Sequence, residues 1–130
     1  MNVKIDTKEK FTVITPQEQD LPANMTEELM DMLLQYLKKD IPHIILNMHL
    51  VDSVDEKMVG MIALIQQQFN VGNASFVICN LHNNIQQLME EKGIHEILNL
   101  TPTESEAWDI VQMEEIEREL MKDLDNNTED

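Results

Sequence analysis

Short apolar runs alternate with longer segments of helical periodicity along almost the whole chain, and this alternation constrains the fold more than any other feature. The runs 44–48 and 75–79 are almost continuously apolar, which is typical of strands buried on both faces of a parallel sheet. Strands that alternate with helices pair in parallel through right-handed crossovers. We therefore predict a single α/β domain.

The predicted element order is β-β-α-β-α-β-α-β-α. The strands are expected at 3–5, 11–15, 44–48, 75–79 and 97–100. The helices are expected at 24–40, from 55 to about 70, around 85–93, and at 103–124. Because the first two strands are joined by a short polar turn, they are predicted to form an antiparallel hairpin. The fold class is thus a mixed sheet of four to five strands packed with about four helices.

Three helix ends carry recognisable signals. Asn24 with Glu27, and Thr103 with Glu106, have the spacing of a capping box at a helix N-terminus. Gly93 lies where a left-handed residue ends the third helix. We expect all three signals to mark real helix ends.

Negative charge is concentrated at the C-terminal end. The 130 residues include 9 Lys+Arg and 25 Asp+Glu, which gives a formal net charge of -16. Residues 104–130 hold 11 of the acidic and 2 of the basic side chains. This balance argues against binding to nucleic acid or to an anionic lipid surface. We expect a domain at 1–124 and a disordered acidic tail at 125–130, with an acidic helix face that is either solvated or a docking surface for a basic partner.

The last predicted helix carries an apolar stripe. Met113, Ile116, Leu120 and Leu124 are spaced 3, 4 and 4 residues apart, so they share one face. Leu120 and Leu124 extend this stripe beyond the length that the domain needs. The stripe could pack on the core or form a homodimer through the C-terminal helix.

Catalytic and metal-binding patterns are weak. The chain has three glycines and no glycine-rich phosphate loop. The four histidines are not paired at helical spacing, so we expect no metal site and no cofactor. They are His43, His49, His82 and His95. We predict a non-enzymatic protein-interaction domain.

Cys79 is the single cysteine, so no intrachain disulfide can form. Its place in a predicted buried strand favours an inert, packed thiol. An alternative is a catalytic pair with His49 or His82, which stand near the ends of neighbouring predicted strands. With no predicted membrane span and no secretory signal, a reducing, cytoplasmic location is expected.

The segment 44–58 resembles the central motif of STAS domains, a family that includes the bacterial anti-sigma factor antagonists. In that motif an apolar strand ends in an acidic or amide residue, here Asn47, and is followed by a valine, here Val51. An apolar residue, here Val54, then precedes the sequence Asp-Ser-x-Gly, which opens a helix. This chain reads Asp55-Glu56-Lys57-Met58 at that point. The resemblance covers about residues 3–120.

The resemblance implies a regulatory, protein-binding role. In the family the motif serine is phosphorylated by a partner kinase that is itself an anti-sigma factor, and phosphorylation weakens the complex. It implies partner contacts through Asp55, Glu56, Lys57 and Met58, with a kinase-like anti-sigma factor as the partner. Glu56 has no hydroxyl, so the usual switch is absent at this degenerate phosphosite. An alternative role is an accessory subunit that docks on a membrane transporter ATPase.

Two questions about this motif stay open at this point. A second alignment uses Asp52-Ser53 and would keep a hydroxyl, although it breaks the spacing from the strand. Asp55 is expected to cap the helix. Glu56 could act as a fixed negative charge in place of phosphoserine, could mark loss of regulation, or could only favour the helix dipole.

Overall fold

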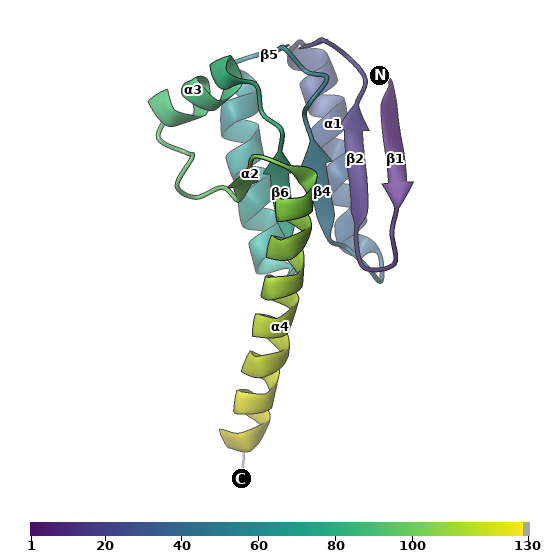
Figure 1. Ribbon diagram of the computed structural model, residues 1–130, viewed down its shortest axis with the longest axis vertical. Coiled ribbons are helices and arrows are strands. Elements are labelled where there is room, and N and C mark those ends of the chain that lie inside the picture. The colour runs from purple at the N-terminus through teal and green to yellow at the C-terminus, as the bar shows by residue number, and fades with distance from the viewer. Residues whose placement is uncertain (129–130) are drawn as a thin grey trace.

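The computed structural model describes residues 1–128 as one mixed α/β domain with a long C-terminal helix (Figure 1). Its strands are β1 (Val3–Thr7), β2 (Thr12–Pro16), β3 (Asp20–Leu21), β4 (Ile44–Asn47), β5 (Ser53–Val54), β6 (Phe76–Cys79) and β7 (Leu100–Thr101). Its helices are α1 (Ala23–Gln35), η1 (Tyr36–Lys38), α2 (Lys57–Val71), α3 (Asn83–Glu91) and α4 (Glu104–Thr128). The predicted fold class is confirmed.

The main sheet has five strands in the order β1-β2-β4-β6-β7. Strands β1 and β2 form the predicted antiparallel hairpin, and every other neighbouring pair is parallel. The short strands β3 and β5 form a separate parallel pair that the sequence did not predict. The carboxyl ends of β4 and β6 therefore meet at one edge of the sheet, where loops to α2 and α3 begin.

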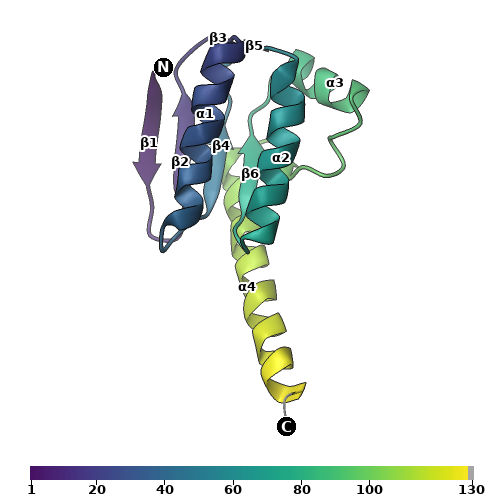
Figure 2. The same cartoon turned by 180° about the vertical axis from the view of Figure 1, so that it is seen from behind.

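Helices cover both faces of the sheet. Figures 1 and 2 show α1 and α2 on one face and α4 on the other. In β4, Ile44 and Leu46 belong to the core beneath α1 and α2, while Ile45 belongs to the core beneath α4. Ala107 and Val111 are the buried side chains through which α4 contacts that second core. Burial on both sides explains why the strands are continuously apolar.

The predicted cap of α1 is wrong. The helix begins at Ala23, directly after Pro22, and no side chain caps it. The Pro22 carbonyl accepts the first helical hydrogen bond from the Thr26 amide at 3.0 Å, and Thr26 Oγ1 donates to the same carbonyl at 3.1 Å. Asn24 is therefore already inside the helix. Proline is tolerated at this position because it has no amide hydrogen that would be left without a partner before the first turn.

The other two end signals are confirmed. Gly93 adopts a left-handed backbone with a φ of 73° after α3. Thr103 Oγ1 accepts a hydrogen bond from the Glu106 amide at 3.2 Å before α4. The strand predicted at 97–100 instead lies at Leu100–Thr101, because a turn closed by the Ile97 amide and the Ile94 carbonyl occupies the preceding residues.

Helix α4 is longer than predicted. It continues past Leu124 to Thr128, so the boundary expected at 124 does not end the helix. Residues 125–128 contain neither glycine nor proline, and nothing in them breaks a helix. Residues 129–130 of the predicted tail lie outside the described residues. The C-terminal part of α4 runs past the end of the sheet in both views (Figures 1 and 2).

Candidate functional site

The segment between β4 and α2 is fixed by backbone hydrogen bonds to the segment before α1. The Asp52 amide donates to the Gln19 carbonyl at 2.7 Å, and the Asp55 amide donates to the Leu21 carbonyl at 2.9 Å. Val51 is fully buried and anchors the middle of the loop in the core. The β3–β5 pair thus holds the start of α2 against the rest of the domain.

Asp55 caps α2 as predicted. Its Oδ1 accepts a hydrogen bond from the Lys57 amide at 2.8 Å, and its carbonyl accepts one from the Met58 amide at 2.9 Å. The carboxylate thereby satisfies an amide that has no partner inside the helix. The role of Asp55 in fixing the helix start is structural, and its side chain remains half-buried at the surface.

The four residues of the motif face different surroundings. Glu56 and Lys57 are exposed at the start of α2, where a partner could reach them. Met58 is 0% exposed and belongs to the core beneath α1 and α2. Its inclusion among the partner-contacting residues is therefore corrected, because a fully buried side chain has no surface to offer.

Ser53 has a different environment from Glu56. It lies in β5, and its hydroxyl donates a hydrogen bond to the Asp20 carboxylate of β3. The residue immediately before α2 is Glu56. Glu56 therefore lies at the start of α2, whereas Ser53 lies in a strand.

A network of polar side chains joins the carboxyl ends of the two central strands. The Asn47 Oδ1 accepts hydrogen bonds from Asn80 Nδ2 at 3.2 Å and from the amide and Nδ1 of His49 at 3.1 and 3.0 Å. The Asn47 Nδ2 donates to Glu104 Oε1 at 3.0 Å. Asn47 thus ties the first turn of α4 to the sheet edge beside the loop.

A second set of contacts fixes the start of α3 to the same loop. The His82 Nε2 donates to the His49 carbonyl at 2.8 Å, and its Nδ1 lies 3.3 Å from Asp52 Oδ1. The Asn84 Nδ2 donates to the Asp52 carbonyl at 2.7 Å. The only sequence signal for these contacts is that polar residues follow the apolar strands. Such a signal does not predict which of the polar residues form a network.

The comparison with protein families agrees with this strand–loop–helix geometry. The STAS domain model matches residues 2–107, which is most of the chain and includes the loop and α2. The chain belongs to the STAS domain family. A direct comparison with curated protein sequences yields no match.

Solved structures with this fold include anti-sigma factor antagonists. A Thermotoga maritima protein described as such is 17% identical, with a TM-score of 0.76, and the match covers 85% of this chain and 94% of that one. RsbS from Moorella thermoacetica, in a form with a serine replaced by glutamate, is 14% identical, with a TM-score of 0.71 and coverage of 86% and 96%.

The fold also occurs inside a membrane transporter. The murine anion transporter Slc26a9 is 16% identical over the match, with a TM-score of 0.67, and the match covers 80% of this chain but 18% of that one. In the present STAS domain, no helix among residues 1–128 has the length and hydrophobicity required to cross a bilayer.

Cys79 of this STAS domain is a packed thiol. Burial, and then the nearby Glu104 charge, raise the pKa of Cys79 to about 12, although a hydrogen bond from Asn80 acts in the opposite direction. The thiol therefore stays protonated at neutral pH, whereas a cysteine nucleophile needs the thiolate.

Within residues 1–128, no group of three His, Cys, Asp or Glu side chains could hold a metal ion.

His43 lies beneath α4, at the opposite end of β4 from the loop. Its Nδ1 accepts a hydrogen bond from the Ser75 amide at 3.0 Å, and its Nε2 lies 3.0 Å from Glu115 Oε2. Burial and then the Arg118 charge lower the pKa of His43, and they outweigh Glu115 and Glu114, which raise it. The ring is therefore neutral at pH 7, with Nε2 donating to Glu115.

We expect the stability of the STAS domain to fall as the pH drops below 6.5, the ordinary pKa of histidine. Below that value the unfolded imidazole binds a proton that the folded ring resists, so protonation favours unfolding. Urea unfolding from pH 7.5 to 5.0 measures this slope. It should be shallower in His43→Gln, and equal slopes in the wild type and His43→Gln would contradict the expectation.

Proposed function

We propose that this chain is a non-enzymatic regulatory domain of the anti-sigma factor antagonist type, which binds a protein partner at the β4–α2 loop and the first turn of α2. The observation that carries this proposal is the fixed helix start, with Glu56 and Lys57 exposed on a loop held by the β3–β5 pair. A surface already held in one conformation loses little entropy when it binds. The proposed partner is a kinase-like anti-sigma factor in the cytoplasm.

The proposed domain works without phosphorylation of this loop. Glu56 supplies one fixed negative charge at the helix start, whereas phosphoserine carries about −1.5 to −2 at pH 7. The nearest hydroxyl in the motif, that of Ser53, is bonded to Asp20 in the short parallel pair. The Moorella thermoacetica relative with glutamate in place of a serine keeps the same fold, so a carboxylate in such a domain is compatible with it.

An alternative function is an accessory subunit that docks on the ATPase of a membrane transporter. The occurrence of this fold within the Slc26a9 anion transporter supports an association between STAS domains and transporters. A subunit that is docked permanently also has no need for a phosphorylation switch. Co-purification with a membrane complex in detergent, rather than with a free anti-sigma factor, distinguishes this alternative.

Glu56→Lys is expected to weaken binding to the partner at least tenfold, which corresponds to about 1.4 kcal/mol. The change reverses the charge at the centre of the proposed surface without touching the core. The partners to test are the kinase-like, ATP-binding regulators encoded near this protein, with affinity measured by calorimetry. Asp31→Lys is the matched control, because Asp31 is exposed in the middle of α1, outside the proposed surface.

The same partner can be used to test whether phosphorylation at position 56 has been lost. Labelled ATP should modify Glu56→Ser and leave the wild type unlabelled, because only the variant has a hydroxyl at the helix start. Equal labelling of both proteins would show that Ser53 is the acceptor and would contradict the proposed alignment. Absence of binding by every such regulator would contradict the anti-sigma factor antagonist assignment.

A further inference from the structure

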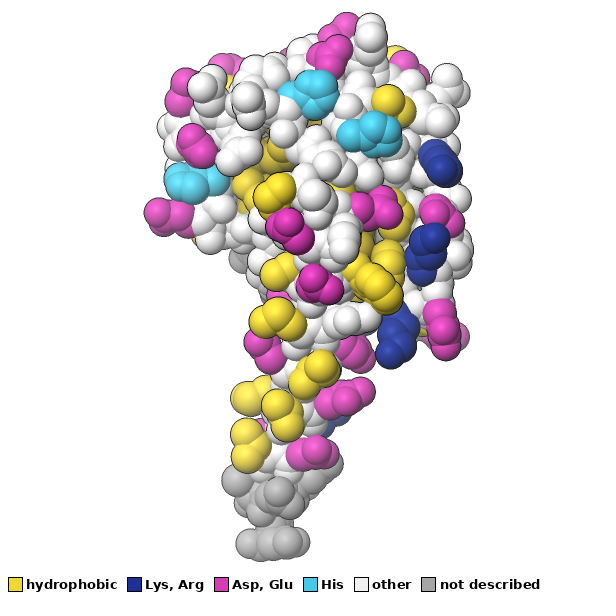
Figure 3. Space-filling model, viewed as in Figure 1, with side chains coloured by type: hydrophobic (Ala, Val, Ile, Leu, Met, Phe, Trp, Pro, Cys, Tyr) yellow, Lys and Arg dark blue, Asp and Glu magenta, His cyan; other side chains and the backbone are white. Residues whose placement is uncertain are grey.

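The projecting helix α4 exposes a continuous row of large apolar side chains. Each of its six members is 45–59% exposed. They are Trp108, Met113, Ile116, Leu120, Met121 and Leu124. Figure 3 shows hydrophobic side chains gathered along this face of the helix, from the domain to its projecting part. Single exposed apolar residues are ordinary, but a contiguous row of this kind marks an interaction surface. We call these six residues the α4 stripe.

Acidic side chains lie among and beside the residues of the α4 stripe. Asp109, Glu117, Glu119 and Asp123 are all exposed on the same helix. At about 100° per residue, Asp109 and Asp123 fall on the same side as Ile116, and Glu117 and Glu119 border that side. Carboxylates are therefore interspersed with the apolar residues of the stripe and also lie beside them.

The basic side chains of α4 lie elsewhere. Residues 104–130 contain two of them, Arg118 and Lys122. Arg118 points to the domain, where its Nη2 donates to Ser75 Oγ at 2.6 Å and its Nη1 donates to Glu115 Oε2 at 2.9 Å. Lys122 lines a hollow on the side of the domain together with Arg118, Asn73 and the stripe residue Met121. Both cations therefore lie on the side of Met121 that faces the domain, and neither is next to Ile116, Leu120 or Leu124 around the helix.

This charge pattern disfavours pairing of α4 with a second copy of itself. Two stripes packed against each other would bring the acidic borders of both helices together, in either helix direction. Like charges across a helical interface select against that pairing. A partner helix with lysine or arginine beside its apolar residues would instead pair its charges with these carboxylates.

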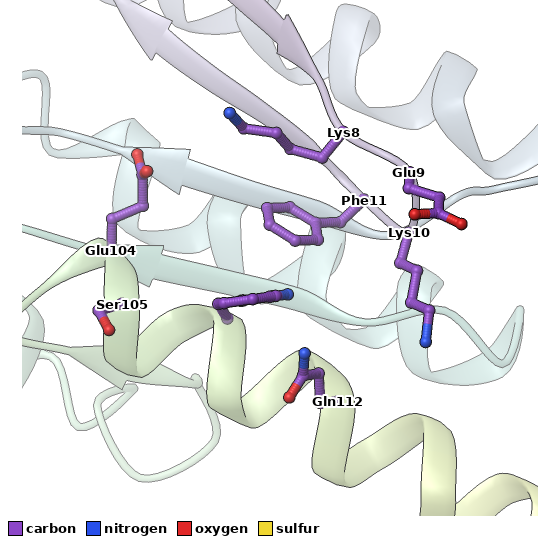
Figure 4. Close-up of a pocket in the computed structure, with 8 residues that line it drawn as sticks. Lys8, Glu9, Lys10, Phe11, Glu104, Ser105 and Gln112 are labelled. Carbon is purple, nitrogen blue, oxygen red and sulfur yellow. The ribbon is translucent and has the colours of Figure 1, made fainter.

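The stripe is continuous with a groove between α4 and the β1–β2 turn. Trp108 and Ile116 line one part of it with Lys10 and Ile41. Trp108 also lines a neighbouring hollow of about 520 Å³, where its ring centroid is 6.1 Å from that of Phe11. Figure 4 shows Phe11 between the turn and α4, with Gln112 on the helix side. The groove offers a half-buried aromatic anchor at the domain end of the stripe, of the kind that dominates many interfaces.

We propose that the α4 stripe is the docking surface for a basic amphipathic helix of a partner protein. The apolar face of that helix covers the stripe and its lysines or arginines pair with the bordering carboxylates, as in other helix-in-groove complexes. The stripe's projecting part lies beyond the amino ends of the parallel strands, away from the loop that precedes α2 (Figure 1). The proposal is thus independent of the function assigned to Glu56.

The test uses the full chain and a synthetic helical peptide of about 20 residues, long enough to span about 30 Å. The peptide carries leucine at every third or fourth position and lysine beside each leucine. Trp108 is the single tryptophan and reports binding through its fluorescence. We expect saturable binding, a blue shift of the emission, weaker binding at high salt, and at least tenfold weaker binding of a second peptide with glutamate in place of lysine.

Matched variants separate the stripe from other exposed apolar residues. Ile116→Ser with Leu120→Ser should weaken binding of the lysine peptide at least tenfold. Leu64→Ser with Val71→Ser, on the exposed side of α2 at 61% and 77% exposure, should leave it unchanged. Glu117→Lys with Asp123→Lys should shift the preference towards the glutamate peptide. Circular dichroism verifies that each variant keeps its helix content.

Three results would overturn the proposal. The first is no binding of the lysine peptide, and the second is equal binding by the wild type and the Ile116→Ser, Leu120→Ser variant. The third is a sedimentation mass that doubles with concentration in the wild type and not in that variant, since this would show a second copy of the chain on the stripe.

Discussion

Replacing Met58 by glycine is expected to destabilise the domain by about 3–5 kcal/mol. The family signature has glycine at this point, but here the Met58 side chain is 0% exposed and packs in the core beneath α1 and α2. Truncating a buried methionine leaves a cavity that typically costs about 2–5 kcal/mol, and glycine in a helix costs up to about 1 kcal/mol more. Because a whole domain is stable by only about 5–15 kcal/mol, this single change removes a large part of the total.

Urea unfolding at pH 7 measures this loss. Met58→Leu is the matched control, because it keeps the volume of the side chain and should cost less than about 1.5 kcal/mol. If Met58→Gly and Met58→Leu unfold at the same urea concentration, the site does not depend on the volume of this side chain. Such a result would contradict the buried position of Met58.

Replacing Asn47 by aspartate is expected to cost about 3 kcal/mol at pH 7, from the repulsion of two close carboxylates at an effective dielectric constant of about 20. In the native protein Asn47 Nδ2 donates to Glu104 Oε1 at 3.0 Å. Asn47→Asp removes this donor and places a second negative charge beside Glu104. The hydrogen bonds that Asn47 Oδ1 accepts from His49 and Asn80 remain available to the new side chain.

A second substitution isolates the cause of this loss. Adding Glu104→Gln to Asn47→Asp removes the repulsion and restores a donor, so most of the lost free energy of unfolding should return. Lowering the pH towards the range where carboxyl groups bind protons should also shrink the difference from the wild type. A double variant as unstable as Asn47→Asp alone would show that the cost does not come from the pair with Glu104.

The candidate site shows where sequence patterns carry information. The cap at Asp55 follows from the residue type and from its position before a run of helical periodicity, and the structure confirms it. The exposure of Met58 could not be judged from the motif alone, because the family residue at that point is small and gives no side chain to place. The hydrogen bond between Asn47 and Glu104 joins residues that are 57 positions apart, so no local sequence pattern predicts it.

The cap predicted at Asn24 also shows that a local sequence pattern is not sufficient to place a helix start. Both Asn24 with Glu27 and Thr103 with Glu106 have the spacing of a capping box, yet only Thr103 accepts the expected hydrogen bond. At α1 the N-cap is Pro22, so the helix starts two residues earlier than the pattern indicates. A capping residue needs an extended backbone, and the residues that flank it decide whether it has one.

The sequence by itself determined the order of the main-sheet strands and the α-helices, the mixed sheet, and the helix ends marked by Asp55, Gly93 and Thr103. These features depend on the spacing of hydrophobic residues and on single residues such as Gly93. Both influence the backbone only within a few positions along the chain. Only the tertiary structure decided which apolar face of α4 is covered. Ala107 and Val111 pack on the sheet, whereas Ile116 and Leu120 stay exposed, because at about 100° per residue they lie on the opposite side of the helix. Periodicity places residues on one face of a helix, but only the packing of that helix against the sheet decides which face is buried.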